Sequence, residues 1–349
     1  MQYLFPFLVA SVASLIACLV VLRVFPEFKL MDKPKKYGLK RAPIPYSVGI
    51  VLYLIFLSTV LFFLPVSQYP SVVGVLIGAG LIVGVSFFDD YRPLPASLRL
   101  IVQGLAGVII VYSGVGIHSI SNPFGEPFSL DSYITMVNGF EIIWLADIFT
   151  ILWIIILINS VNWLDGVNGL ASGVGGIAAL ALFFLSSRSG FHMIDQEPVI
   201  IMSVILAGIF LVFWCFDFYP AKMLMGDSGS MFLGFMLAVL SIFSGGKIAT
   251  AFLILGFPLL DFFWVILQRV IRGQSPFKGK DRLHLHDKLM DMGIPLRWIL
   301  FLIYVLCAVF GFSALFLGSM GKFAAVTIMA VIMIVMVLVT WQGERSELK

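Results

Sequence analysis

The sequence predicts an all-α membrane protein that crosses the bilayer many times. Of its 349 residues, 60% are hydrophobic and only 12% are charged, and the mean hydropathy is +1.06. A soluble domain carries about 25% charged residues, so this composition is that of a membrane protein. Apolar runs of about 17 to 23 residues, each long enough to cross about 30 Å of hydrocarbon as a helix, recur along the chain. We therefore expect a single integral-membrane domain over residues 1–349.

About eleven such runs follow one another, each read as a transmembrane helix. They lie near residues 4–24, 47–65, 71–88, 97–115, 144–160, 169–186, 198–216, 229–244, 247–267, 297–318 and 322–341. The three cysteines, Cys18, Cys215 and Cys307, all fall inside these runs. Their spacing is not that of a metal site, so we expect them to be core residues.

Lysine and arginine concentrate in alternate connections between the runs. The odd-numbered connections carry most of them, or are followed closely by them: Lys29, Lys33, Lys35, Lys36, Lys40, Arg41, Arg92, Arg99, Lys222, Arg269, Arg272, Lys278, Lys280, Arg282, Lys288 and Arg297. The other connections hold only Arg188, Lys247 and Lys322. By the positive-inside rule, the loops near 25–46, 89–96, 159–168, 217–228 and 268–296 are cytoplasmic. The N-terminus is then outside and the C-terminus cytoplasmic.

The external connection at 116–143 differs from the others. It contains no lysine or arginine, and polar and apolar residues partly alternate over 128–134. Alternation of this kind is typical of a β-strand, so we expect a short hairpin at the membrane surface.

Four polar clusters fall in the cytoplasmic connections. They are 88–92 with Asp89 and Asp90, the Asn/Asp/Gly-rich stretch 159–169, residues 225–230 with Asp227, and 280–287. Adjacent carboxylates repel one another and stay ionised cheaply only beside a cation. Mg²⁺ prefers one or two carboxylates together with substrate phosphates. The small residues around Asp227 leave the backbone open to a phosphate at a helix N-terminus.

The last cluster adds histidines to these carboxylates. His284 and His286, with the basic residues around them, can neutralise or position phosphate charge. Asp261 lies inside the ninth apolar run, where an acidic residue is functional by default, whereas Asp217 and Lys222 read as an interfacial pair. Together the clusters indicate phosphoryl-group chemistry at the cytoplasmic face, on a substrate reached from the membrane.

Two other classes of protein fit parts of the pattern. A multi-span transporter would explain the many spans and Asp261, but its polar sites belong near the bilayer midplane in repeated halves. An intramembrane aspartyl protease could use Asp227, but it needs a second acid in mid-span, whereas Asp89, Asp90 and Asp165 lie at span ends.

The motifs resemble those of the polyprenyl-phosphate N-acetylhexosamine-1-phosphate transferases, the WecA/TagO/MraY superfamily of glycosyltransferase family 4. The resemblance covers nearly the whole chain. It is carried by Asp89-Asp90, Asn159-x-x-Asn162-x-x-Asp165-Gly166-x-x-Gly169-Leu170, Met225-Gly226-Asp227-x-Gly229-Ser230 and Asp281-Arg282-x-His284-x-His286, with Asp32-x-Pro34 and Pro43-x-Pro45 in the first loop.

The resemblance implies a helical bundle with a cytoplasmic active site. Such enzymes transfer a sugar-1-phosphate from a UDP-sugar to undecaprenyl or another polyprenyl phosphate and release UMP. This is the first membrane step of a cell-envelope glycan such as lipopolysaccharide or teichoic acid. The implied cofactor is Mg²⁺, which Mn²⁺ can replace. The implied location is the plasma (inner) membrane; no nucleic-acid partner is expected, and a homodimer is compatible with the sequence.

The resemblance also implies roles for particular residues. Asp89 matches the acid that deprotonates or places the lipid phosphate, Asp90 supports the metal or the phosphates, and Asp227 is the principal metal ligand. The residues implied to bind the nucleotide, the diphosphate or the sugar are Asn162, Asp165, Asn168, Lys40, Lys222 and Arg282. His284 and His286 form the late histidine motif and are implied to be catalytic.

The sequence departs from the family pattern at three places. The late motif ends in Asp287 instead of a second paired histidine, a histidine and an arginine of the first loop are Lys40 and Tyr46, and a Gly-Gly is Val48-Gly49. The muramoyl-pentapeptide branch typically has three consecutive histidines, which are absent here. The resemblance therefore favours the WecA/TagO branch and UDP-GlcNAc, with phospho-MurNAc-pentapeptide transfer as the alternative.

Overall fold

The structure of the protein is a computed structural model that describes residues 2–37, 40–137, 140–188, 195–244, 248–276 and 282–347. The helices are α1 (Leu4–Glu27), α2 (Gly49–Phe63), α3 (Pro70–Tyr91), α4 (Ala96–Tyr112), α5 (Trp144–Leu164), α6 (Leu170–Ser186), α7 (Glu197–Asp217), α8 (Gly226–Phe243), α9 (Ile248–Ile254), α10 (Gly256–Ile271), α11 (Leu285–Asp291), α12 (Leu296–Ser313) and α13 (Ser319–Glu347). There are two 3-10 turns, η1 (Pro34–Tyr37) and η2 (Val66–Gln68), and four strands, β1 (Ser119–Ile120), β2 (Phe128–Ser129), β3 (Ile134–Val137) and β4 (Phe140–Ile143).

Helices cover all eleven of the apolar runs, but they differ in length and shape. Among the described residues, α1, α3, α5, α7, α8, α12 and α13 are long and apolar enough to cross a membrane. The pair α9 and α10 passes the same test but bends by 89° at its break. The helices α2, α4 and α6 are apolar and only 15, 17 and 17 residues long. The protein thus has seven candidate spans, or eight with the bent pair, while eleven spans and their orientation stay a prediction.

α8 is the central helix of the bundle and is almost completely buried. It packs mainly between α3 and α5, and its first turn touches the first turn of α2. A Cβ added at Gly49 would lie 2.0 Å from the backbone nitrogen of Gly229, so only glycine permits this approach. Small residues at such crossings are how membrane helices pack closely. The contact fixes the start of α8 against the end of the first loop.

Much of the outer surface of the bundle is apolar, as expected for a surface that faces lipid. Exposed large apolar side chains include Leu61, Phe62 and Ile271. Cys18 and Cys307 are buried as predicted, but Cys215 is exposed. The prediction for Cys215 was wrong because its side of α7 faces away from the bundle.

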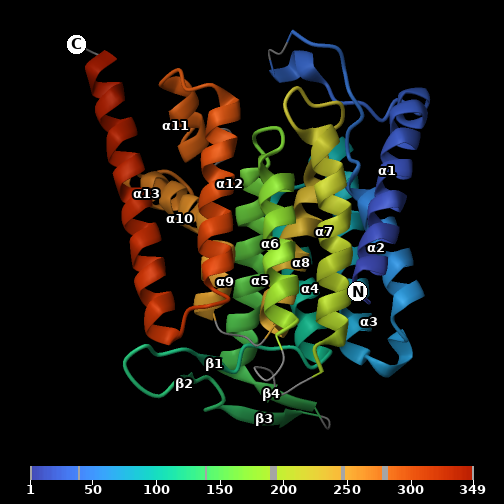
Figure 1. Ribbon diagram of the computed structural model, residues 1–349, viewed down its shortest axis with the longest axis vertical. Helices are drawn as coiled ribbons and strands as arrows, with labels where there is room; N and C mark the ends of the chain where they lie inside the picture. The colour runs from blue at the N-terminus through green and yellow to red at the C-terminus, as the bar shows by residue number, and fades with distance from the viewer. Residues whose placement is uncertain are drawn as a thin grey trace.

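The two ends of the bundle differ in structure (Figure 1). At one end, β1 pairs with β2 and β3 pairs with β4, both antiparallel. This confirms strands in the connection at 116–143, although the alternating stretch 128–134 is split between β2 and β3. The first loop and α11 lie at the opposite end, near the C-terminus. There the backbone N–H of Leu224 donates to the carbonyl of Pro45 at 2.9 Å, which joins the first loop to the loop before α8.

Candidate active site

The carboxylate of Asp90, near the end of α3, joins the first loop to the start of α8. One oxygen accepts hydrogen bonds from the Tyr46 hydroxyl (2.9 Å) and the Asp227 backbone N–H (2.8 Å). The other accepts from the Ser47 hydroxyl, the Ser228 backbone N–H (3.3 Å) and the Ser228 hydroxyl (2.9 Å). Asp90 therefore caps the N-terminus of α8, where the unpaired N–H groups and the helix dipole favour an anion.

Gly226 makes this cap possible. Its φ is +71°, and a Cβ at this position would lie 2.7 Å from a carboxylate oxygen of Asp90. Only glycine satisfies both conditions. As a result α8 begins at Gly226, and Asp227 lies in its first turn instead of in the preceding loop, where the sequence placed it.

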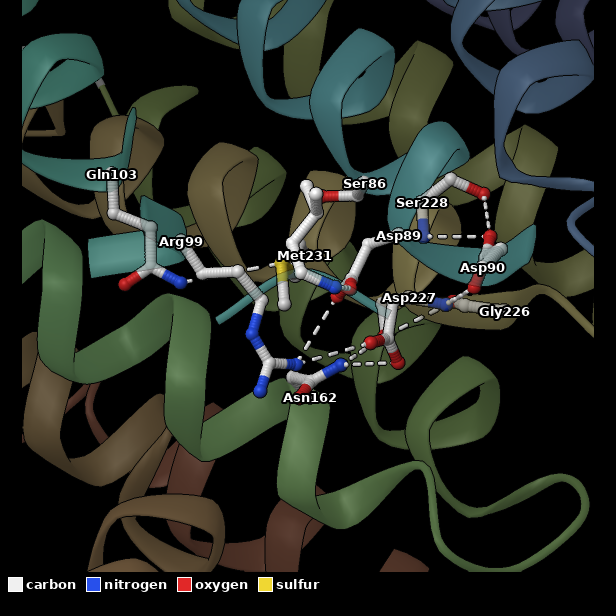
Figure 2. A network of polar contacts seen from close by, with 12 residues as sticks. Ser86, Asp89, Asp90, Arg99, Gln103, Asn162, Gly226, Asp227, Ser228 and Met231 are labelled. Atoms are coloured by element: carbon white, nitrogen blue, oxygen red, sulfur yellow. Dashed lines mark hydrogen bonds and ion pairs between the residues drawn. The ribbon is translucent and has the colours of Figure 1, made fainter. Parts of the chain in front are cut away.

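A second network surrounds the side chain of Asp227 (Figure 2). Asn162, in the last turn of α5, donates to Asp227 Oδ1 at 3.1 Å and to the Ser230 hydroxyl at 2.9 Å. Arg99 Nη1, from the first turn of α4, lies 3.2 Å from Asp89 Oδ2 and 3.5 Å from Asp227 Oδ2. Asp89 is buried and also accepts from the backbone N–H of Leu94 at 2.5 Å. Two carboxylates from α3 and α8 therefore converge on one positive group.

This convergence of two carboxylates is a candidate position for a divalent cation. The oxygens of Asp89 and Asp227 already share a cationic partner, and the Asp227 side chain is one-third exposed, at 34%. Mg²⁺ takes one or two carboxylates and completes its shell with water and phosphate oxygens. Both oxygens of Asp90, in contrast, are engaged by the five donors described above. Asp227 thus fits the ion best, Asp89 fits it where the ion takes the place of Arg99 as the shared cation, and the metal role of Asp90 stays a prediction.

A cavity of about 370 Å³ opens beside these carboxylates. Its lining includes two of the predicted nucleotide-binding residues, Asp165 and Asn168, together with Asp90 and Asp227. Two cations of the first loop, Lys33 and Arg41, and the rings of Tyr46 and Tyr91 also line it. The cavity therefore combines phosphate-binding cations, aromatic surfaces and hydrogen-bonding carboxylates, which suits a nucleoside diphosphate.

Electrostatics in this cavity are governed by neighbouring acids. Burial raises the pKa of Asp165 well above its ordinary value, and the negative charges of Asp217, Asp227 and Asp90 raise it further. Burial and the charge of Asp90 also raise the pKa of Tyr46, so its hydroxyl stays protonated and donates to Asp90. The concentration of negative charge favours ligands that bring cations or hydrogen-bond donors.

The predicted histidines lie together at a different part of the site. His284 and His286 are both buried, with stacked rings whose centroids are 5.3 Å apart. His284 Nδ1 lies 2.6 Å from Asp261, so the two side chains are in direct contact and form an ion pair when the imidazole is protonated. His286 Nε2 lies 3.5 Å from where a Cβ on Gly166 would stand, which brings the motif against the loop that forms the cavity wall.

Four predicted binding residues are not among the residues that line the cavity, and one of them, Asn162, donates to Asp227 instead. Lys40 and Lys222 are exposed, and Arg282 is paired with Asp291 at 2.6 Å. Asp281 lies outside the described residues. Asp217 forms no ion pair with Lys222 among the described residues; it accepts hydrogen bonds from the Gly169 backbone N–H and the Ser172 hydroxyl at the start of α6.

Sequence reasoning did not assign the roles of Arg99 and Ser47. Arg99 was used only to predict which loops are cytoplasmic. Its position ten residues after Asp89 and inside an apolar run was a usable signal of a functional role. Ser47 gave no signal, because its partner Asp90 is 43 residues away along the chain. The ion pair of Arg41 with Asp32, at 2.5 Å, was likewise not foreseen.

Known proteins share this sequence pattern. Residues 72–245 match the family described as Glycosyl transferase family 4. The probable undecaprenyl-phosphate N-acetylglucosaminyl 1-phosphate transferase of Bacillus subtilis (strain 168) is 28% identical over 338 residues, which cover 95% of this chain and 89% of that protein. The undecaprenyl-phosphate alpha-N-acetylglucosaminyl 1-phosphate transferase of Yersinia pestis is 27% identical over 297 residues, 83% of this chain and 77% of that protein. The phospho-N-acetylmuramoyl-pentapeptide-transferase of Streptococcus uberis (strain ATCC BAA-854 / 0140J) is 30% identical over 259 residues, 66% of this chain and 72% of that protein.

Proposed function

The chain belongs to glycosyl transferase family 4, and from this premise we propose that it transfers N-acetylglucosamine-1-phosphate from UDP-GlcNAc to a polyprenyl phosphate. A phosphate oxygen of the lipid attacks the phosphorus that bears the sugar, and the bond from that phosphorus to UMP breaks. The products are polyprenyl-diphosphate-GlcNAc and UMP. The observation that carries the proposal is the cavity, in which cations of the first loop and the carboxylates of α3 and α8 face one another.

The three carboxylates Asp227, Asp89 and Asp90 are proposed to have different roles, according to their positions. Asp227 and Asp89 would hold Mg²⁺, which when bound neutralises diphosphate charge and polarises the reacting phosphorus. Asn162 fixes the Asp227 carboxylate by donating to one oxygen. Asp89, near the end of the apolar helix α3, is proposed also to meet the lipid phosphate and accept its proton. Asp90 holds the first turn of α8, and with it Asp227, in place.

The donor nucleotide is proposed to bind in the cavity between the first loop and the loop after α5. Asp165 and Asn168 offer acceptors and donors to the nucleoside, and Lys33 and Arg41 offer positive charge to the diphosphate. Since the basic loops surround this site, we place it on the cytoplasmic face, where UDP-sugars are made. Arg41 is held by Asp32, which orients its guanidinium.

The choice of sugar rests on two supports. The Bacillus subtilis and Yersinia pestis relatives carry N-acetylglucosaminyl 1-phosphate in their names, and the His-x-His motif is that of the same branch. Phospho-MurNAc-pentapeptide transfer is the second candidate, favoured by the likeness to the Streptococcus uberis protein. Purified protein with undecaprenyl phosphate and a panel of radiolabelled UDP-sugars decides between them. We expect lipid-linked product from UDP-GlcNAc, and product from UDP-MurNAc-pentapeptide alone would overturn the assignment.

A further inference from the structure

Asp261 is a buried carboxylate that no step above uses. It lies in the second turn of α10, just after the 89° bend that separates α9 from α10, and is 2% exposed. One oxygen lies 2.6 Å from His284 Nδ1, and the other accepts the backbone N–H of Leu285 at 2.8 Å. Both contacts reach the beginning of α11. A buried charge is tolerated only when it is paired and hydrogen-bonded, and Asp261 satisfies both conditions through one short segment.

Three helices meet around His284. The edge of its ring faces Trp163 of α5, with ring centroids 6.0 Å apart and planes at 80°. The guanidinium of Arg269, from α10, lies 4.4 Å from the centroid of the same tryptophan. His286 stacks on His284 with an angle of only 10° between the planes. The position of one imidazole therefore sets the position of the other.

The charged groups around the pair make the two histidines different. Burial and the positive charge of Arg269 lower the pKa of His284. The hydrogen bond to Asp261 and the negative charges of Asp261 and Asp287 raise it, and the net result is a pKa above the ordinary histidine value. Burial lowers the pKa of His286, and the charges of His284 and Arg282 oppose those of Asp261 and Asp287. The two stacked imidazoles therefore have pKa values shifted in opposite directions, upward for His284 and downward for His286.

His286 connects this arrangement to the cavity. Its Nε2 lies 3.8 Å from Asp287 and beside Gly166, which lines the cavity. Its Nδ1 is buried and has no hydrogen-bond partner among the described residues. A buried polar atom without a partner is costly, so its orientation must be imposed by the stacking partner and by the first turn of α11.

We propose that Asp261 is a positioning residue for the histidine motif: one oxygen holds the His284 ring through Nδ1, the other holds the first turn of α11, and stacked His286 is thereby fixed against the cavity wall. The motif lies beside Gly166, which lines the cavity where the donor nucleotide is proposed to bind, so this inference rests on the proposed function. A side chain that is already held in place needs no reorganisation during transfer.

The side-chain titration of His284 tests the proposal without any need for activity. The protein has only four histidines, so the imidazole NMR signals of the full-length protein in detergent can be assigned by His→Gln variants. We expect His284 to titrate above the ordinary histidine value of about 6.5, and Asp261→Asn to lower its midpoint by about 1 to 3 pH units. A wild-type midpoint at or below the ordinary value, which needs no variant, overturns the proposal.

Transfer kinetics then test the role of the pair. The alkaline limb of kcat/KM should move to lower pH in Asp261→Asn, and Asp261→Glu, which keeps the charge, should restore part of it. Asp147→Asn is the matched control, because Asp147 also accepts a backbone N–H, from Ile143 at the start of α5, and does not contact His284 or the cavity. An equal displacement of the limb in Asp147→Asn, or none in Asp261→Asn, contradicts the positioning role. If UDP-GlcNAc gives no product at all, the proposed function fails while the NMR titration still decides the role of Asp261.

Discussion

Replacing Asp90 with asparagine tests whether this residue acts mainly as the cap of α8. The side chain would keep one acceptor oxygen, but the new amide nitrogen would face two or three groups that now donate to Asp90. Each partly buried donor left without an acceptor costs about 1–3 kcal/mol, which for two donors gives about 2–6 kcal/mol. Because Asp90 is only half-buried and water can replace part of the loss, we expect the lower half of that range.

Thermal unfolding in detergent, followed by intrinsic fluorescence, measures this loss. For a chain of 349 residues, a destabilisation of this size corresponds to a fall in Tm of roughly 3–6 °C. Asp131→Asn serves as the control, since Asp131 pairs with His118 on the exposed hairpin and should change Tm little. The result that refutes the capping role is an Asp90→Asn protein with wild-type Tm that needs far more Mg²⁺ for activity, because Asp90 would then be a metal ligand.

Four further outcomes follow from the site. Asp227→Asn should abolish most activity while the protein still inserts, and near-normal turnover at saturating Mg²⁺ would contradict its metal role. Asp89→Asn should lower kcat by about 10² to 10⁴ with little change in KM for the UDP-sugar; recovery of kcat in excess Mg²⁺ would make it a metal residue only. Because the pKa of Asp165 is raised, its carboxylate protonates as pH falls through a value above that of an ordinary aspartate. The KM for UDP-GlcNAc should then rise toward acid pH, and Asp165→Asn should have a high KM that varies less with pH. A reporter fused after Lys349 should score cytoplasmic, and a periplasmic signal would split the polar clusters between two faces.

The apolar runs and the polar clusters were predictable because both are local properties of the sequence. Ten runs each became one helix and the ninth became the bent pair α9 and α10. Asp89, Asp90, Asn162 and Asp227 came together at one end of the bundle, as their common side predicted. The length of an apolar run and the polar residues at its end can be read from the sequence without knowing how the helices pack.

The ends and bends of the helices were not predictable, because distant contacts set them. α8 begins before its apolar run since Asp90, 137 residues earlier, caps it. The 89° bend lies where α10 begins at Gly256, and a Cβ there would stand 2.0 Å from the Met329 side chain of α13. The partnership of Asp261 with His284 depends on that bend, so the sequence could mark Asp261 as functional but could not identify its partner.

The fate of the sugar-bearing phosphorus tests the central claim most directly. Purified protein would be given UDP-GlcNAc labelled with ³²P at the phosphorus next to the sugar, together with undecaprenyl phosphate and Mg²⁺. The account predicts that the label enters the lipid together with GlcNAc and that unlabelled UMP is released, with neither product formed by Asp227→Asn. Label released to the aqueous phase as UDP, with only the sugar on the lipid, would show transfer of a glycosyl group and contradict the account.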